Sequence, residues 1–235
     1  MNLESIDDPA ALAWAREWSD KTEARFPRPE TQQKIRELLD ADDRIPFVSR
    51  RGEYLYNFWR DASHPRGIWR RRQGSEWEVL IDVDTLADLE GEDWVWKGVH
   101  VRRPDLTRAL VRLSRGGADA TVVREFDLET LSFVDDGFYL PEAKSDVAWL
   151  DADTLLVGTD TGDGSLTTSG YPMQVRRWSR GQSLTDAPVI ASGEPSDVAV
   201  GAGVDHGRII VERALDFYTT QTQVSTDDGM VQLDL

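Results

Sequence analysis

The sequence of 235 residues contains no cysteine, only three histidines and only four lysines. The missing thiols exclude disulfide bonds, thiolate metal ligands and a cysteine nucleophile. No stretch approaches the roughly 20 apolar residues of a membrane-spanning helix. The N-terminus has no basic segment followed by an unbroken apolar one, so we expect no signal peptide and a cytoplasmic setting.

Positive charge is also scarce. The chain has 43 acidic and 27 basic residues, which gives a net charge of −16. Binding to nucleic acid needs a clustered cationic surface that displaces counterions, and anionic membrane surfaces attract basic segments. We therefore expect no nucleic-acid partner and no membrane partner, and we interpret the acidity as a contribution to solubility.

Residue types that serve in catalysis or metal binding do not cluster in the sequence. His64 precedes a proline in a turn, His100 falls within an expected strand and His206 lies in an Asp-His-Gly turn. No two of them have the spacing of metal ligands, and none is paired with a nucleophile. Residues 160–164 resemble a calcium loop but lack its third ligand and its distal Glu. The sequence predicts no catalytic, cofactor-binding or metal-binding residue and no cofactor.

Residues 7–41 have helical periodicity. Asp8 followed by Pro9 is typical of a helix start, and Trp14 and Trp18 recur at helical spacing after it. A second helix is predicted from about Glu30 to Leu39. Two amphipathic helices need a partner that covers their apolar faces, and this partner is either the sheet that follows or a domain outside the chain.

From residue 44 the chain alternates strands and turns. Aromatic and β-branched residues alternate at period two between Gly and Pro turns, which indicates antiparallel strands. Two identical Ser-Asp-Val-Ala segments, at 145–148 and 196–199, lie fifty-one positions apart. Four strands in a repeat of roughly 45 to 50 residues are typical of propeller blades. A single twisted sandwich would explain the alternation but not the repeat.

The predicted fold class is mainly β, a partial β-propeller of about four four-stranded antiparallel blades preceded by two short α-helices. The expected division is a helical segment at 1–43 and a partial propeller at 44–235, with blades at about 45–82, 95–135, 145–192 and 197–234. Propellers usually have up to eight blades. We therefore expect open sheet edges that favour self-association.

Two further groups could contact a ligand. Arg66 and the run Arg70 to Arg72 could bind a peptide carboxylate, but their alternation in one strand favours solvated outward positions. Trp94 and Trp96 could line a ligand pocket. We interpret them instead as buried packing residues of a blade.

Several segments resemble the N-terminal part of bacterial prolyl oligopeptidase family proteins. The first are DDRIP at 42–46, SRRG at 49–52, YLYNFWRD at 54–61 and HPRG at 64–67. Further matches follow in order along nearly the whole chain: WEVLIDVD at 77–84, WVWKG at 94–98, LSRGGADA at 113–120, VREFDL at 123–128, LPEAKS at 140–145 and GYP at 170–172. The resemblance therefore lies in the identity of the residues as well as in their spacing.

The resemblance implies a seven-bladed propeller that caps an α/β-hydrolase domain in a serine peptidase for short peptides, often cut after proline. It also implies that residues 1–43 dock on that hydrolase domain, which becomes the expected partner together with short peptides. The chain has no G-x-S-x-G nucleophile motif, so it is predicted to lack the Ser-Asp-His triad and to be inactive alone. The alternative is a stand-alone propeller that serves as a binding scaffold without catalysis.

Overall fold

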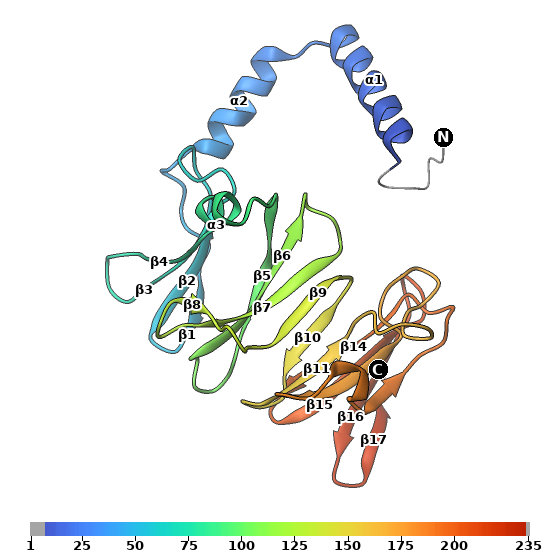
Figure 1. Ribbon diagram of the computed structural model, residues 1–235. Coiled ribbons are helices and arrows are strands. Elements are labelled where there is room, and N and C mark those ends of the chain that lie inside the picture. Colours follow the sequence, from blue (N-terminus) through green and yellow to red (C-terminus); the bar gives the residue numbers. More distant parts are fainter. Residues whose placement is uncertain (1–7, 234–235) are drawn as a thin grey trace. The chain divides into compact units, whose positions relative to one another are not determined.

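The computed structural model describes residues 8–233, and it divides the chain into two compact units (Figure 1). The first unit comprises the residues up to Ile45 together with Arg60–Pro65. The second comprises Pro46–Trp59 and the chain from Arg66 onward. None of the helices in the described part is both long and apolar enough to cross a membrane.

The first unit contains two helices, α1 (Pro9–Arg25) and α2 (Pro29–Asp40), as predicted. The Asp8 carboxylate caps α1, because its Oδ1 accepts hydrogen bonds from the amides of Ala10 at 2.7 Å and Ala11 at 3.1 Å. Large apolar side chains remain exposed along this unit: Leu12, Trp14, Trp18, Phe26, Ile35, Leu38 and Leu39. The apolar faces of both helices are therefore open to solvent in this unit.

The second unit consists of four antiparallel sheets that follow one another in chain order (Figure 1). The first sheet contains β1 (Ser49–Arg51), β2 (Tyr54–Trp59), β3 (Ile68–Arg72) and β4 (Glu78–Asp82). The second contains β5 (Trp94–Val101), β6 (Arg108–Arg115), β7 (Thr121–Asp127), β8 (Ser132–Phe133) and β9 (Tyr139–Ala143). The third contains β10 (Asp146–Trp149), β11 (Thr154–Gly158), β12 (Gln174–Ser179) and β13 (Val189–Ser192), with the 3-10 turn η1 (Leu184–Asp186) before β13. The fourth contains β14 (Ala199–Asp205), β15 (Arg208–Ala214), β16 (Thr220–Thr226) and β17 (Gly229–Leu233).

Within each sheet, consecutive strands pair with each other, which confirms the predicted mainly β fold of four four-stranded units. The second sheet has one addition. Strand β9 pairs with β7, with Val123 opposite Leu140, so this sheet continues beyond residue 135 to Ala143. The two-residue strand β8 covers only the end of β7, and β9 pairs with the remainder of that edge.

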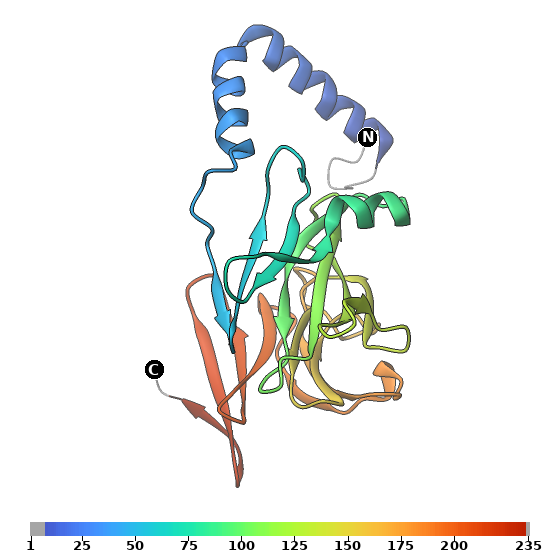
Figure 2. The ribbon, with the colours of Figure 1, turned by 90° about the vertical axis from the view of Figure 1, so that its left-hand side faces the viewer.

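A third helix, α3 (Val83–Glu90), connects β4 with β5, where the sequence predicted none (Figure 2). The Asp82 side chain caps its start by accepting the amides of Asp84 and Thr85, and Gly91 ends it in the left-handed conformation with φ 67°. Val83 and Ala87 are buried. The helix therefore depends on two capping residues and on packing, not on a long periodic pattern.

Apolar layers fill the space between consecutive sheets, and the central strands contribute to the layers on both of their faces. In β11, Leu155 and Val157 belong to the layer shared with the second sheet, whereas Leu156 belongs to the layer shared with the fourth. In β6, Leu110 faces the third sheet and Val111 faces the first. Successive residues of a strand point to opposite faces, so this burial on both faces is the packing expected of stacked blades.

Candidate functional site

The first strands of the four sheets line a common hollow of about 980 Å³. Its wall is formed by Arg51 at the end of β1, by Val99–Val101 of β5, by all of β10 and by Gly201–Asp205 of β14. A propeller arranges its blades around a central channel, and these strands occupy the corresponding position in each sheet. The hollow is the candidate functional site.

Small residues bring β14 close to β10 at this wall. A Cβ atom added at Gly201 would lie 2.7 Å from Oδ2 of Asp146, which is closer than real Cβ atoms approach an oxygen. The same Oδ2 accepts a hydrogen bond from the amide of Ala202 at 3.1 Å. Glycine at 201 therefore allows a carboxylate of the third sheet to bind the backbone of the fourth.

Charges of opposite sign lie on different parts of the wall. Arg51 of the first sheet and Arg103, in the connection between β5 and β6, supply guanidinium groups. The third and fourth sheets supply carboxylates from Asp146, Asp205 and Glu212. The hollow thus has a cationic side and an anionic side, which is an arrangement that suits a ligand carrying both charges.

Two groups on the wall have shifted pKa values. Burial and the nearby charge of Arg103 lower the pKa of Arg51, although a guanidinium remains charged at neutral pH. His100 lines the hollow, and burial, followed by the nearby charge of Arg112, lowers the pKa of His100. His100 is therefore a neutral hydrogen-bonding group at neutral pH, not a cation.

A second hollow, of about 410 Å³, lies where α3 and β5 meet β7 and β9. Four of its charged residues form two ion pairs: Arg115 with Glu92 at 2.9 Å, and Arg124 with Glu90 at 2.7 Å. The indole Nε1 of Trp94 donates to the same Glu90 at 2.7 Å. Since these charges neutralise each other, we interpret this hollow as part of the ion-pair framework of the second sheet.

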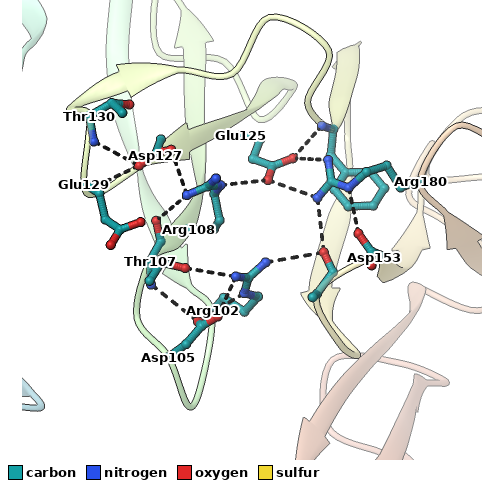
Figure 3. Close-up of polar contacts among 12 residues, drawn as sticks. Arg102, Asp105, Thr107, Arg108, Glu125, Asp127, Glu129, Thr130, Asp153 and Arg180 are labelled. Carbon is teal, nitrogen blue, oxygen red and sulfur yellow. Dashed lines mark hydrogen bonds and ion pairs between the residues drawn. The ribbon is translucent and has the colours of Figure 1, made fainter.

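A buried carboxylate joins the second sheet to the third (Figure 3). Glu125 of β7 accepts hydrogen bonds from Arg180 at 2.8 and 3.1 Å and from the amide of Phe138 at 2.8 Å. Arg180 also donates to Asp153 at 3.0 Å, and its bonds to Glu125 raise the pKa of Arg180. Arg108 lies 3.7 Å from the same carboxylate. No sequence pattern pointed to Glu125, because a Glu within an alternating strand pattern is ordinarily exposed.

The three histidines lie in the turns and the strand in which the sequence analysis placed them. His64 lies in a turn with its Nδ1 2.9 Å from Asp61. His100 lies in β5 and His206 in the turn between β14 and β15. Both line the large hollow, which sequence spacing could not indicate. No group of three His, Cys, Asp or Glu residues within 8–233 is arranged to hold a metal ion.

The loop at 160–164 forms a turn closed by its own side chains. The Asp160 carboxylate accepts the amide of Gly162 at 2.9 Å and the hydroxyl of Ser165 at 3.3 Å. The first of these bonds ties the aspartate to the backbone two residues on, as in an Asx turn. The Asp160 carboxylate therefore has hydrogen-bond partners within the loop itself.

The predictions for the arginine run and for the two tryptophans have different outcomes. The Cζ atom of Arg70 lies 4.6 Å from the ring centroid of Trp59 and 4.3 Å from that of Trp77, so the expectation of a solvated outward position was wrong for Arg70. Alternation alone does not reveal that a long guanidinium side chain can lie over aromatic rings. Trp94 is 2 % exposed, and the Trp96 ring stacks on Phe58 at 5.1 Å, as expected of packing residues.

Comparison with known proteins gives consistent matches. Residues 3–212 match the sequence model of a family described as prolyl oligopeptidase, N-terminal beta-propeller domain. An uncharacterized peptidase of Sinorhizobium fredii is 37% identical over 93% of this chain and 33% of its own length. An uncharacterized peptidase of Rickettsia prowazekii is 30% identical over 92% of this chain and 33% of its own length. The chain therefore spans about a third of the length of these curated relatives.

Solved structures match over the same extent. A post-proline cleaving enzyme from Rickettsia typhi superposes with a TM-score of 0.87 at 29% identity and covers 99% of this chain and 38% of that one. Oligopeptidase B from Leishmania major superposes with a TM-score of 0.70 at 14% identity over 97% of this chain and 33% of that one. The second match shows the shared fold alone.

Proposed function

The chain belongs to the prolyl oligopeptidase family of serine peptidases, through its N-terminal β-propeller domain, and we propose that it gates the access of short peptides to a catalytic domain. The catalytic partner would be a C-terminal α/β-hydrolase domain of the parent protein. The parent would hydrolyse short peptides, and residues 1–235 alone would be inactive because they contain no G-x-S-x-G motif. The predicted cytoplasmic setting stays a prediction.

The observation that carries this proposal is the hollow along β5, β10 and β14. Its volume of about 980 Å³ lies at the upper end of the range of small-ligand sites. An extended peptide can enter a passage of this size, whereas a folded domain cannot. Its polar wall also suits a peptide, which carries amide groups along its whole length.

The exposed apolar faces of α1 and α2 support the presence of a second domain. Trp14 and Trp18 contact each other with ring centroids 6.2 Å apart, yet they remain 44% and 52% exposed. Leu38 and Leu39 of α2 are exposed as well. We propose that residues 1–43 dock on the hydrolase domain, since contiguous exposed apolar residues mark interaction sites.

The test compares the full-length parent protein with residues 1–235. On a chromogenic prolyl peptide, the parent should show turnover and the shorter chain should not. Turnover by the shorter chain that survives re-purification and is blocked by a serine-directed inhibitor would contradict the proposal. For gating, the parent should cleave a prolyl octapeptide but not the same eight residues placed in a loop of a folded protein. Equal kcat/KM values for both would disprove gating.

A stand-alone scaffold has less support in the structure. Met230, Val231 and Leu233 of β17 are 39% to 48% exposed, so the outer strand of the fourth sheet presents apolar side chains to solvent. A finished scaffold should be a compact monomer in sedimentation velocity. We propose instead that residues 1–235 self-associate through open sheet edges and faces, with a sedimentation coefficient that rises with concentration.

A further inference from the structure

Arg51 and Arg103 are the arginines among the residues that line the hollow. The arginines close to Arg103 in the sequence have carboxylate partners: Arg102 bonds to Asp105 at 2.5 Å, and Arg108 pairs with Asp127 at 2.8 Å. Neither Arg51 nor Arg103 has an ion pair with any residue of the described range 8–233. The two guanidinium groups therefore keep their capacity to bind an anionic group of a ligand in the hollow.

The fold brings these two arginines together from different sheets. Arg51 ends β1, and Arg103 follows β5, yet both line the same hollow. The Arg51 guanidinium lies over the Tyr56 ring at 5.8 Å, which positions it. The charge of Arg103 is near enough to contribute to the lowered pKa of Arg51. Two like charges held in one hollow repel each other, and a bound anion would relieve that repulsion.

We propose that Arg51 and Arg103 bind a carboxylate group of the peptide that enters the hollow. Guanidinium groups match carboxylates with two parallel hydrogen bonds, which gives both strength and orientation. The carboxylate is either the C-terminus of the peptide or an acidic side chain. This inference rests on the proposed function, and it adds a substrate class, namely short peptides with a free carboxylate.

The opposite wall strengthens the assignment to a peptide. Asp146 and Glu212 place carboxylates on the third and fourth sheets around the same hollow. Asp146 uses Oδ2 for the amide of Ala202, so its charge stays fixed in position. A peptide whose carboxylate binds the two arginines can direct its ammonium group toward this wall. The two sides together select the orientation of the peptide in the hollow.

The experiment uses the full-length parent protein and three probes: the tetrapeptide Ala-Gly-Pro-Phe, its C-terminal amide, and Ala-Gly-Pro-Glu amide. With wild-type protein, kcat/KM should be about fivefold higher for the free acid than for its amide, the effect of one ion pair in a water-filled site. Arg51→Gln and Arg103→Gln should each reduce this ratio toward one, and Arg51→Lys should retain part of it. An acidic side chain is the recognised group if only the Glu-containing amide responds to the substitutions.

The matched control is Arg50→Gln, which removes the same charge from the neighbouring position of β1. Arg50 does not line the hollow, and its Nε donates to the carbonyl of Gly52 at 3.2 Å. The inference would be overturned if Arg51→Gln and Arg103→Gln changed neither this ratio nor the cleavage of the Glu-containing amide. An equal loss in Arg50→Gln would overturn it as well. If the parent cleaves none of the peptides, the proposed function fails. Isothermal titration calorimetry with the same probes then tests the inference separately. Wild-type protein should bind the free acid more tightly than its amide, and Arg51→Gln should remove this difference.

Discussion

The apolar layer between the first and second sheets differs in kind from the layer between the third and fourth. The former is built on aromatic rings, with Tyr56, Trp69 and Phe126 all buried. The latter is aliphatic, and its buried members are Leu156, Val175, Val200 and Val211. Aromatic side chains bury more area and add ring contacts. The apolar layers therefore hold neighbouring sheets together with unequal strength. The free energy of local unfolding should decrease from the first layer to the last.

The largest effect is expected at the centre of the aromatic layer. The Trp69 ring lies 5.7 Å from Tyr56, 5.6 Å from Trp96 and 6.0 Å from Phe126. Trp69→Ala should lower the free energy of unfolding by about 4 kcal/mol, because it removes these contacts and leaves a cavity. Val200→Ala in the aliphatic layer should cost about 1 kcal/mol. Urea denaturation of both variants measures the two losses. A loss of less than about 2 kcal/mol in Trp69→Ala would contradict the expected contribution of the aromatic contacts.

The second effect concerns the polar link between the second and third sheets. Glu125→Gln removes the charge that Arg180 and Arg108 share, and it leaves two guanidinium groups beside a neutral amide. The expected loss is about 3 kcal/mol of unfolding free energy, since breaking a buried pair uncovers a charge. The control is Glu129→Gln, an exposed residue near β7, which should change stability by less than about 0.5 kcal/mol. A loss of less than about 1 kcal/mol in Glu125→Gln would mean that Asp153 and Asp127 alone compensate the charges of Arg180 and Arg108.

Local sequence patterns predicted the strands well because each strand carries its own alternation. The turn at His206 and Gly207 was placed correctly between β14 and β15, and Asp8 was correctly identified at the start of α1. Helix α3 was missed because its eight residues follow the strand-like run of β4 directly. Its formation depends on the Asp82 cap and on the burial of Val83, and only the second of these comes from tertiary packing.

The repeated Ser-Asp-Val-Ala segment shows why the site could not be derived from the sequence. In the first copy, Asp146 begins β10 and binds the amide of Ala202 in the neighbouring sheet. In the second copy, Asp197 precedes β14 and binds Arg213 within its own sheet. Identical residues thus have different partners. The hollow requires first strands that are far apart in the chain, so no local pattern indicates that Arg51 and Arg103 face it.

A third, smaller effect is expected in the fourth sheet, where the stability contributed by Asp197 should depend on pH. Hydrogen bonds from Arg213 hold the pKa of Asp197 below its usual value of 3.8, and Asp197 is 4% exposed. A lowered pKa in the folded state stabilises the protein at pH values above the unfolded pKa, and this contribution disappears as the pH falls through the folded pKa. Asp197→Asn should therefore cost about 1.5 kcal/mol at pH 7. Urea titrations below about pH 4 should show the difference from wild type shrinking, and a constant difference would contradict the charge-based explanation.

The smallest effect is expected in the hollow, and it separates the residues that bind a ligand from those that hold the sheets together. Arg213→Gln removes the partner of the buried Asp197 and should destabilise the fourth sheet. Arg51→Gln breaks no ion pair and relieves the repulsion from Arg103, so the free energy of unfolding should stay within about 0.5 kcal/mol of wild type. Urea denaturation of the two variants gives this comparison. If Arg51→Gln lost more than about 1 kcal/mol, Arg51 would be a structural residue of the first sheet, and its guanidinium would not be available to a carboxylate.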